Sequence, residues 1–312
     1  MKIRAAVLVV CAVILSAVAV QGQDKLSLKL KAPKGRVWDV KVASKQTITQ
    51  SIMGNEITIH QEMLLGYEYR VQNVDKQGNT TLKITFTSVK FHESGPMGVT
   101  RYSSETAEPP QGAAVGFAAL PGKSYTVTMS PSGEVLSMTG VADMMASIFA
   151  FIDNNNAATN ELIKQSMRAS FGEDAIKETM EINTDFYPKA EVSPGDTWTS
   201  SVIINNGFPM ILANKYTYKG KEEGLAVIEQ ETEIEPNKAA KFMKVPGMDM
   251  RYMVQGTQKG EYRIDPATGI FMNGKIDMNL HGNVEARNED GKTIQFPMTL
   301  TTKQEIKATP HG

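Results

Sequence analysis

Few side chains in this sequence have the types and spacing that chemistry requires. The four histidines (His60, His92, His281 and His311) form no pair at a spacing typical of metal ligands. We find no Gly-x-Ser-x-Gly motif of hydrolases and no glycine-rich phosphate-binding loop. The sequence therefore predicts no catalytic residue, no metal site and no cofactor, and we expect a protein that is not an enzyme.

Sulfur chemistry offers two further possibilities. Cys11, the only cysteine, lies inside an apolar run and does not match the position of an acylated lipoprotein cysteine. The rest of the chain can form neither a disulfide nor a thiol nucleophile. Met248, Met250 and Met253 resemble the thioether clusters that bind copper in secreted proteins. Methionine also fills irregular apolar space in cores, and we favour that interpretation for the 18 methionines.

The N-terminus has the pattern of an export signal. Lys2 and Arg4 precede an apolar run, and small residues follow it. We expect a signal peptide over residues 1–22, with cleavage after Ala19 or after Gly22. No later segment is apolar enough to span a membrane. The sequence therefore predicts an exported protein, periplasmic or secreted, with no membrane span in the mature chain.

The charge balance argues against anionic partners. The chain has 33 Lys and Arg residues and 34 Asp and Glu residues, a formal net charge of −1. A protein without excess positive charge has little attraction for nucleic acid. Its 41 % hydrophobic content is that of an ordinary globular protein with a sizeable core.

A central helical region, residues 141–182, is the first of the elements that could position a functional site. Its first part has apolar residues at i, i+3, i+4, i+7, i+8 and i+11, one helical stripe: Val141, Met144, Met145, Ile148, Phe149 and Ile152. A second helix is expected over about 160–171, and a third carries Ile176 and Met180. Ser170 and Glu173 predict a capping box, with Gly172 at the break between helices. These helices bury one side only, so a sheet must cover that side.

Strand patterns occupy both flanks of the helices. Apolar residues hold the odd positions from Ile57 to Val71 and the even positions from Ile270 to Ala286. Strands of that length twist and coil, so we expect a curved sheet. A change of phase near Ser88 predicts a β-bulge. Pro297 cannot donate a ladder hydrogen bond, so the last strand is expected to be an edge strand or to carry a bulge.

The two β segments resemble each other. A Gly-x-x-Trp turn opens each, at Gly35–Trp38 and Gly195–Trp198, and similar hairpin and turn motifs follow in the same order. Either the β unit is duplicated, or two unrelated meanders share turn residues. We favour duplication and predict an α+β fold: a curved antiparallel, barrel-like sheet from two duplicated β halves with a central helical insertion. Its parts are a first β half (23–140), central helices (141–187) and a second β half (188–312), in one structural unit.

A longer motif introduces the second half. Residues 188–198 read Pro-x3-Val-x2-Gly-Asp-x-Trp. The chain here resembles uncharacterised exported bacterial proteins classed as a domain of unknown function. That resemblance implies an exported β-rich fold and assigns no activity. The layout alone is also similar to periplasmic lipoprotein-carrier proteins, in which a curved sheet holds an apolar ligand against helices.

These elements predict where a ligand would bind. A curved sheet closed by helices can leave an apolar cavity between them. We expect a lipid or other apolar ligand there. Seven apolar side chains of the first helix and of the strand over 270–286 would bind it: Met144, Met145, Ile148, Phe149, Ile152, Met272 and Met278. The leading interpretation is a non-catalytic envelope protein, and the alternative is a secreted hydrolase with an unrecognised site. The sequence predicts no particular protein partner.

Overall fold

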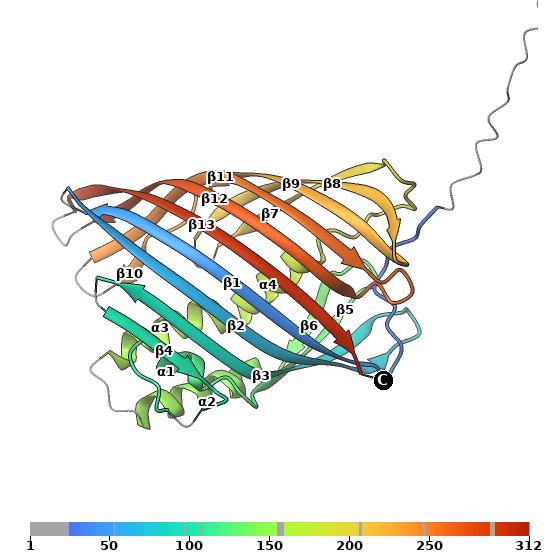
Figure 1. Ribbon diagram of the computed structural model, residues 1–312, viewed down its shortest axis with the longest axis horizontal. Helices are drawn as coiled ribbons and strands as arrows, with labels where there is room; N and C mark the ends of the chain where they lie inside the picture. Colours follow the sequence, from blue (N-terminus) through green and yellow to red (C-terminus); the bar gives the residue numbers. More distant parts are fainter. Residues whose placement is uncertain are drawn as a thin grey trace, which may run out of the picture.

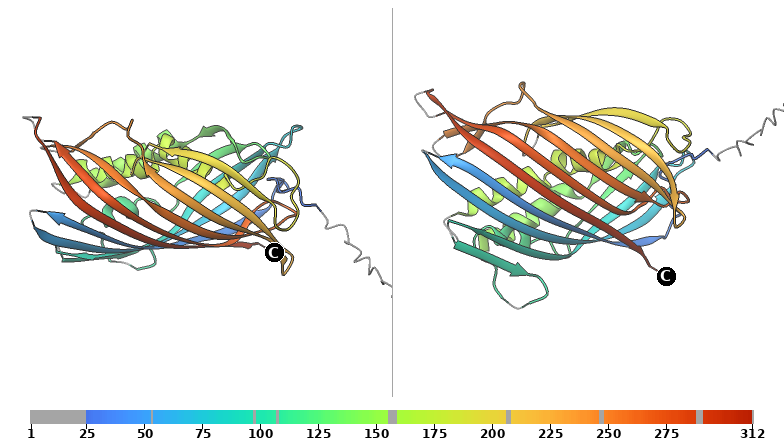
Figure 2. Two further views of the ribbon diagram at one scale, coloured as in Figure 1. Left: turned by 90° about the horizontal axis from the view of Figure 1, so that it is seen from above. Right: turned by 45° about the horizontal axis from the view of Figure 1, so that its top comes forward.

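The computed structural model describes residues 25–311 apart from 53, 97, 107, 155–158, 206–207, 246–247 and 288–290. The predicted signal peptide lies outside the described residues. Most of the chain forms one antiparallel sheet, and a few helices lie against its concave side (Figures 1 and 2). Among the described helices none is both long and apolar enough to cross a membrane.

The elements follow one another along the chain as follows. The first half comprises β1 (Val37–Ile52), β2 (Asn55–Val74), β3 (Thr80–Gly95), β4 (Gly98–Ser103), α1 (Ala114–Ala118), β5 (Ser124–Met129) and β6 (Val135–Thr139). The central helices are α2 (Val141–Asn154), α3 (Asn160–Phe171) and α4 (Glu173–Thr184). The second half comprises β7 (Thr197–Ile204), β8 (Met210–Glu222), β9 (Leu225–Pro236), β10 (Met243–Val245), β11 (Met248–Ile264), β12 (Phe271–Arg287) and β13 (Thr293–Pro310).

The strands of the first half and those of the second lie side by side in the sheet, joined through the first and last strands of the chain. The strand order runs β6-β5-β3-β2-β1-β13-β12-β11-β9-β8-β7, with β4 on β3 and β10 on β11. The first and last strands of the chain's sheet, β1 and β13, therefore pair in its middle, and β6 and β7 are its outer strands. The connection from β6 to β7, which carries α2–α4, crosses from one edge to the other. The sheet is antiparallel and curved, as predicted, but it is open, so the barrel-like description holds only in part.

The position of Pro297 explains how a proline is accommodated in an interior strand. We expected an edge strand or a bulge, but β13 lies between β1 and β12. Its ladder with β1 ends at Gln50 opposite Met298. Pro297 lies one residue beyond that end and faces Asn283 of β12 only. The strand is interior along most of its length, and the proline occupies the part that has a single neighbour.

The strand register confirms the β-bulge predicted near Ser88. Gly66 pairs with Ser88 and Tyr67 with Phe86, so Thr87 is the extra residue of a β-bulge. A Cβ at Gly66 would lie 2.4 Å from the Ser88 hydroxyl, and glycine avoids that clash.

The helix break falls at Gly172, but the predicted capping box is wrong. Gly172 itself is the N-cap of α4, without a side-chain hydrogen bond, and Ser170 belongs to α3. A Cβ at Gly172 would lie 2.5 Å from the Arg168 carbonyl oxygen. The close approach of this carbonyl, rather than capping chemistry, calls for glycine at the break.

The two Gly-x-x-Trp turns have the same backbone geometry. Gly35 N–H donates to the Val71 carbonyl, and Gly195 N–H donates to that of Tyr218. The next residue of each turn accepts in return, from Val71 N–H and from Tyr218 N–H. Trp38 then pairs with Tyr69, as Trp198 pairs with Tyr216. The matched motifs therefore occupy matched positions in the two halves.

Candidate ligand-binding cavity

A cavity of about 400 Å³ lies between the sheet and the last central helix. Its walls come from the sheet's concave face, from α4 and the end of α3, and from the segment before β1. The lining residues are Leu30, Val40, Val42, Tyr67, Tyr69, Leu82, Ile84, Phe86, Tyr125, Met129, Ser170, Phe171, Ile176, Thr179, Met180, Ile182, Asn183, Thr184, Phe186, Tyr187, Tyr216, Gln258, Tyr262, Ile270, Phe271, Ile276, Met278, Thr302, Gln304 and Ile306. This volume suits a single small ligand.

Helix α4 forms the wall opposite the sheet. Ile176 and Met180 lie four residues apart, so they share one helical face, and both are buried. Glu173 and Asp174 occupy the first turn, where negative charge interacts favourably with the helix N-terminus. The amphipathic pattern of α4 thus places an apolar face over the concave side of the sheet.

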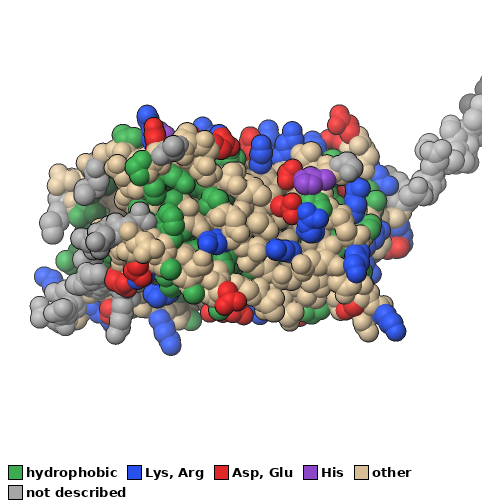
Figure 3. Space-filling view, turned by 90° about the horizontal axis from the view of Figure 1, so that it is seen from below, with side chains coloured by type: hydrophobic (Ala, Val, Ile, Leu, Met, Phe, Trp, Pro, Cys, Tyr) green, Lys and Arg blue, Asp and Glu red, His purple; other side chains and the backbone are tan. Residues whose placement is uncertain are grey.

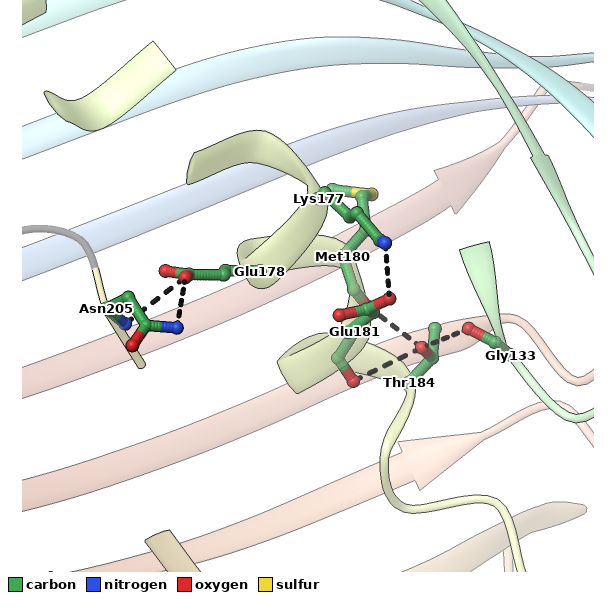
Figure 4. A network of polar contacts seen from close by, with 7 residues as sticks. All are labelled: Gly133, Lys177, Glu178, Met180, Glu181, Thr184 and Asn205. Carbon is green, nitrogen blue, oxygen red and sulfur yellow. Dashed lines mark hydrogen bonds and ion pairs between the residues drawn. The ribbon is translucent and has the colours of Figure 1, made fainter. Parts of the chain in front are cut away.

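Polar contacts hold α4 to both edges of the open sheet, as Figure 4 shows in part. The Thr184 hydroxyl lies 2.7 Å from the carbonyl oxygen of Gly133, in the turn between β5 and β6. The Glu178 carboxylate accepts from the backbone N–H and the side-chain amide of Asn205, directly after β7, at 3.2 and 3.3 Å. The helix therefore bridges two outer strands that do not pair with each other.

The residue after this helix is the centre of a polar network. Asp185 Oδ2 accepts hydrogen bonds from three side chains: the hydroxyl of Ser200, the Asn214 amide at 2.8 Å and the Tyr216 hydroxyl at 3.0 Å. Burial, together with the neighbouring Asp185 carboxylate, raises the pKa of Tyr216. Tyr216 thus stays a neutral phenol whose hydroxyl donates a hydrogen bond to the carboxylate.

A second layer of the network extends to the cavity wall. Asn214 Oδ1 accepts from the Gln230 amide at 3.0 Å and from the Thr232 hydroxyl at 2.7 Å. Gln230 Oε1 in turn accepts from the Gln258 amide at 3.1 Å and from the Tyr262 hydroxyl. Asn214, Gln230 and Thr232 are only 3 to 4 % exposed. These bonds fix the orientation of Gln258 and Tyr262, which line the cavity.

Tyrosines make up an unusual part of the wall. Six of the nine tyrosines line the cavity: Tyr67, Tyr69, Tyr125, Tyr187, Tyr216 and Tyr262. Burial raises the pKa of Tyr69 to about 12, and the pKa values of Tyr67 and Tyr125 are also raised, first by burial. Packing orders the rings, since Tyr67 lies 4.9 Å from Phe86 and Phe86 lies 5.7 Å from Phe171, centroid to centroid. The wall is therefore rich in packed aromatic rings, and its phenols are neutral.

Charged side chains are excluded from this wall. No Lys, Arg, His, Asp or Glu is among the described residues that line the cavity. Charged side chains instead lie on the outer surface, and Figure 3 shows them around a patch of hydrophobic side chains on one face. The cavity thus combines apolar surface with uncharged hydrogen-bonding groups.

Of the seven side chains predicted to bind a ligand, only Met278 lines the cavity. The stripe of Met144, Met145, Ile148 and Ile152 is buried, but it belongs to the filled core of α2, which packs on β5 and on α1 and α3. Helix α4, rather than α2, faces β12 across the cavity. The predicted opposition of the α2 stripe and the β12 face is therefore wrong.

The two remaining predicted ligand residues also lie outside the cavity wall. Phe149 is partly exposed and lies under the Arg168 guanidinium, at 4.5 Å. Met272 packs against the main core from its margin. Neither side chain is among the described residues that line the cavity.

The sequence does contain a signal for the polar network. On β8 and β9 all even positions from 210 to 218 and from 226 to 234 are buried, and apolar residues hold most of them. Asn214, Gln230 and Thr232 interrupt this pattern at neighbouring buried positions. Polar residues at buried strand positions need partners. The segment before β1 was also missed, although Leu26, Leu28 and Leu30 alternate and are buried.

The described residues offer little for metal chemistry. They contain no group of three or more His, Cys, Asp or Glu side chains that could hold an ion. Met250 and Met253 both belong to β11, but three residues along a strand place side chains on opposite faces. Met250 packs in an apolar cluster with Leu280 and Val284. These positions fit the interpretation that methionine fills apolar space.

Comparison with known proteins gives a family and a likeness in fold. A model described as "Family of unknown function (DUF6263)" matches residues 77–271. No curated protein matches the chain in sequence. A structure of lipovitellin, described as showing lipid–protein interactions, matches with a TM-score of 0.50 at 9 % identity. The match covers 89 % of this chain and 25 % of that chain, so the present chain corresponds to about a quarter of its length.

Two further structures are less similar. DynF, from the dynemicin biosynthesis pathway of Micromonospora chersina, matches with a TM-score of 0.22 at 8 % identity, over 91 % of this chain and 85 % of that one. An outer membrane channel from Pseudomonas putida F1 matches with a TM-score of 0.19 at 7 % identity, over 90 % and 97 %. Of these three structures, lipovitellin alone reaches a TM-score of 0.50, and that likeness concerns the fold alone.

Proposed function

We propose that this chain, which belongs to the DUF6263 family of unknown function, binds one lipid-like apolar molecule between α4 and the sheet. The cavity carries the proposal: about 400 Å³ of space with a largely apolar and aromatic wall. Well-packed interiors rarely leave a space of this size empty, whereas ligand sites commonly have it. The role that follows is non-catalytic: to hold or carry the ligand.

The likeness in fold to lipovitellin supports this proposal. That structure is described as showing lipid–protein interactions, and the likeness in fold extends over 89 % of the present chain. A curved sheet with helices on its concave side brings two apolar surfaces face to face. Where these surfaces are held apart, an apolar molecule can fill the space between them.

The non-catalytic part of the proposal rests on the chemistry of the wall. The described lining residues include no histidine, carboxylate or lysine that could act as a general base. The carboxylate of Asp185, which accepts a hydrogen bond from the lining residue Tyr216, receives three such bonds on one oxygen. We propose that this carboxylate stabilises the attachment of α4 rather than taking part in a hydrolytic reaction.

We also propose that the protein is exported. The pattern of Lys2, Arg4 and the apolar run that follows them supports this, because it is typical of a signal peptide. A ligand carrier in the cell envelope would meet lipids there. The site of action that we propose is thus the periplasm or the extracellular space.

The test is native mass spectrometry and solvent extraction of protein purified from the exporting cell. We expect an extractable apolar molecule at a stoichiometry of one. Ile276→Trp fills the cavity from β12 and should remove that molecule. Ile203→Trp is the matched control, because Ile203 is 55 % exposed on β7 and away from the cavity. An empty wild-type protein that takes up no apolar probe would overturn the proposal.

A further inference from the structure

We propose that the ligand is an uncharged amphiphile whose hydroxyl, ester or amide group is recognised at one end of the cavity by Gln258, Thr302 and Gln304. This inference rests on the proposed function and names the chemical class of its ligand. Long-chain alcohols and monoacylglycerols belong to this class, whereas fatty-acid anions do not.

The first argument comes from the absence of countercharge. Every described residue of the wall is apolar or neutral and polar. An ionised carboxylate or phosphate inside such a wall would lose its hydration and gain no opposite charge, which strongly disfavours its entry. A neutral head group loses less hydration and can recover it through hydrogen bonds to the wall. The cavity therefore selects against charge wherever the ligand is enclosed.

The second argument is the position of the polar residues in the sheet. Gln258, Met278 and Thr302 are direct neighbours across β11, β12 and β13. They form the last row of the cavity, because the next row on the same face, which includes Leu280 and Leu300, belongs to a separate apolar cluster and does not line it. Strands lie about 4.8 Å apart, so the backbones of Gln258 and Thr302 are roughly 10 Å apart, and the side chains of both residues line the cavity.

The third argument is an unpaired hydroxyl in this row. Thr302 is only 6 % exposed, and its Oγ1 has no hydrogen-bond partner among the described residues. A buried hydroxyl without a partner destabilises the folded protein, so such groups call for an explanation. A bound head group supplies one, since rotation about χ1 of Thr302 to another staggered conformer can move its hydroxyl to the position now held by its methyl group. Gln304, two residues along the same face, makes no side-chain hydrogen bond with another described residue and lines the same end.

The fourth argument is that Gln258 is already oriented. Its amide donates to Gln230 Oε1, which also accepts from Tyr262, and Gln230 in turn donates to Asn214. This chain of hydrogen bonds ends at the Asp185 carboxylate. With its amide nitrogen held in this way, Gln258 can present its carbonyl oxygen to a donor on the ligand. A preorganised acceptor of this kind costs little conformational entropy on binding.

The test compares neutral and anionic probes on delipidated protein without the signal peptide. Displacement of a fluorescent apolar dye is measured for a fatty alcohol, a monoacylglycerol, a fatty acid and an alkane of equal chain length, at a pH where the acid is ionised. We expect the alcohol and the monoacylglycerol to bind at least about tenfold more tightly than the acid or the alkane, in line with the net effect of one or two hydrogen bonds. Equal binding of all four probes would overturn this inference and leave the apolar-ligand function standing. Failure of every probe and of the dye would overturn both.

Thr302→Val isolates the recognition step. Valine keeps the shape of threonine and removes the hydroxyl, so binding of the alcohol should weaken about three- to tenfold while alkane binding is unchanged. The same variant should raise the melting temperature of the empty protein, because it removes an unpaired buried hydroxyl. Thr301→Val is the matched control, since Thr301 is exposed on the opposite face of β13. A Thr302→Val protein that binds the alcohol as wild type does would contradict the assignment.

Discussion

The hydroxyl of Thr184 lies 2.7 Å from the carbonyl oxygen of Gly133, and the next residue, Asp185, is bound by three side chains of β7 and β8. Gly133 belongs to the turn before one outer strand, and β7 is the other outer strand. Two consecutive residues therefore connect opposite edges of a sheet that does not close. The cavity depends on this connection, because α4 forms the wall opposite the sheet.

Removal of the Thr184 hydroxyl should loosen the first of these attachments. We expect Thr184→Val to lower the free energy of unfolding by about 1–2 kcal/mol, the usual cost of leaving a carbonyl group without its donor. Thr184→Ser keeps the hydroxyl and should recover most of the loss. Urea unfolding at neutral pH measures both variants. Equal stability of the valine and serine variants would mean that the contact contributes nothing.

Replacement of the carboxylate should have a larger effect on the second attachment. Asp185→Ala leaves the amide of Asn214 and the hydroxyl of Tyr216 without their acceptor, and both residues are buried. We expect a loss of roughly 2–3 kcal/mol, because hydrogen bonds to charged groups are stronger than neutral ones. Asp277→Ala, at an exposed position of β12, is the matched control and should change little. Hydrogen exchange in α4 should be faster in Asp185→Ala than in the wild type and unchanged in Asp277→Ala, which would show that the lost stability comes from the attachment of this helix.

The two tryptophans should differ, although their turns match. Trp38 is 2 % exposed, and Trp38→Ala should lower stability by about 3–5 kcal/mol. Trp198 is only partly buried on an outer strand, so Trp198→Ala should cost less. Its indole N–H is buried without a partner among the described residues, and Trp198→Phe should therefore be neutral or stabilising. Thermal melting of the three variants distinguishes these cases, and a larger loss for Trp198→Ala than for Trp38→Ala would contradict them.

The buried phenols predict a loss of stability in alkali. Burial raises the pKa of Tyr69 to about 12, whereas a tyrosine in the unfolded chain ionises near pH 10. The folded state thus favours the neutral form, and this contribution is complete below about pH 10 and is lost as the pH rises towards 12. Tyr69→Phe should reduce the slope of stability against pH in that range. Denaturant unfolding across the range tests this, and an unchanged slope would count against the assignment.

Export makes a prediction that mass measurement can check. The mature protein should begin at Val20, after cleavage behind Ala19, or at Gln23, after cleavage behind Gly22. Intact-mass analysis of the envelope fraction distinguishes the two products. A product that retains Met1, or that carries acyl chains on Cys11, would contradict the predicted signal peptide.

The sequence by itself determined the features that depend on local periodicity. The odd apolar positions from Ile57 to Val71 fall within β2, and the change of phase near Ser88 marks the bulge at Thr87. The break at Gly172 separates α3 from α4. Each of these features follows from side-chain direction or backbone sterics within a few residues, so neighbouring positions in the chain contain the information.

Only the tertiary structure decided which surfaces meet. The stripe of α2 and the face of α4 are both amphipathic, and nothing local indicates which of them lies over β12. Pro297 suggested an edge strand, but the end of the β1 ladder at Gln50 allows it in an interior one. Likewise, Asn214 and Gln230 become a network only when Asp185 arrives from the far end of the helical insertion. Pairing between distant segments depends on the path of the whole chain, because each surface must bury its apolar area against another, and several partners could satisfy that need.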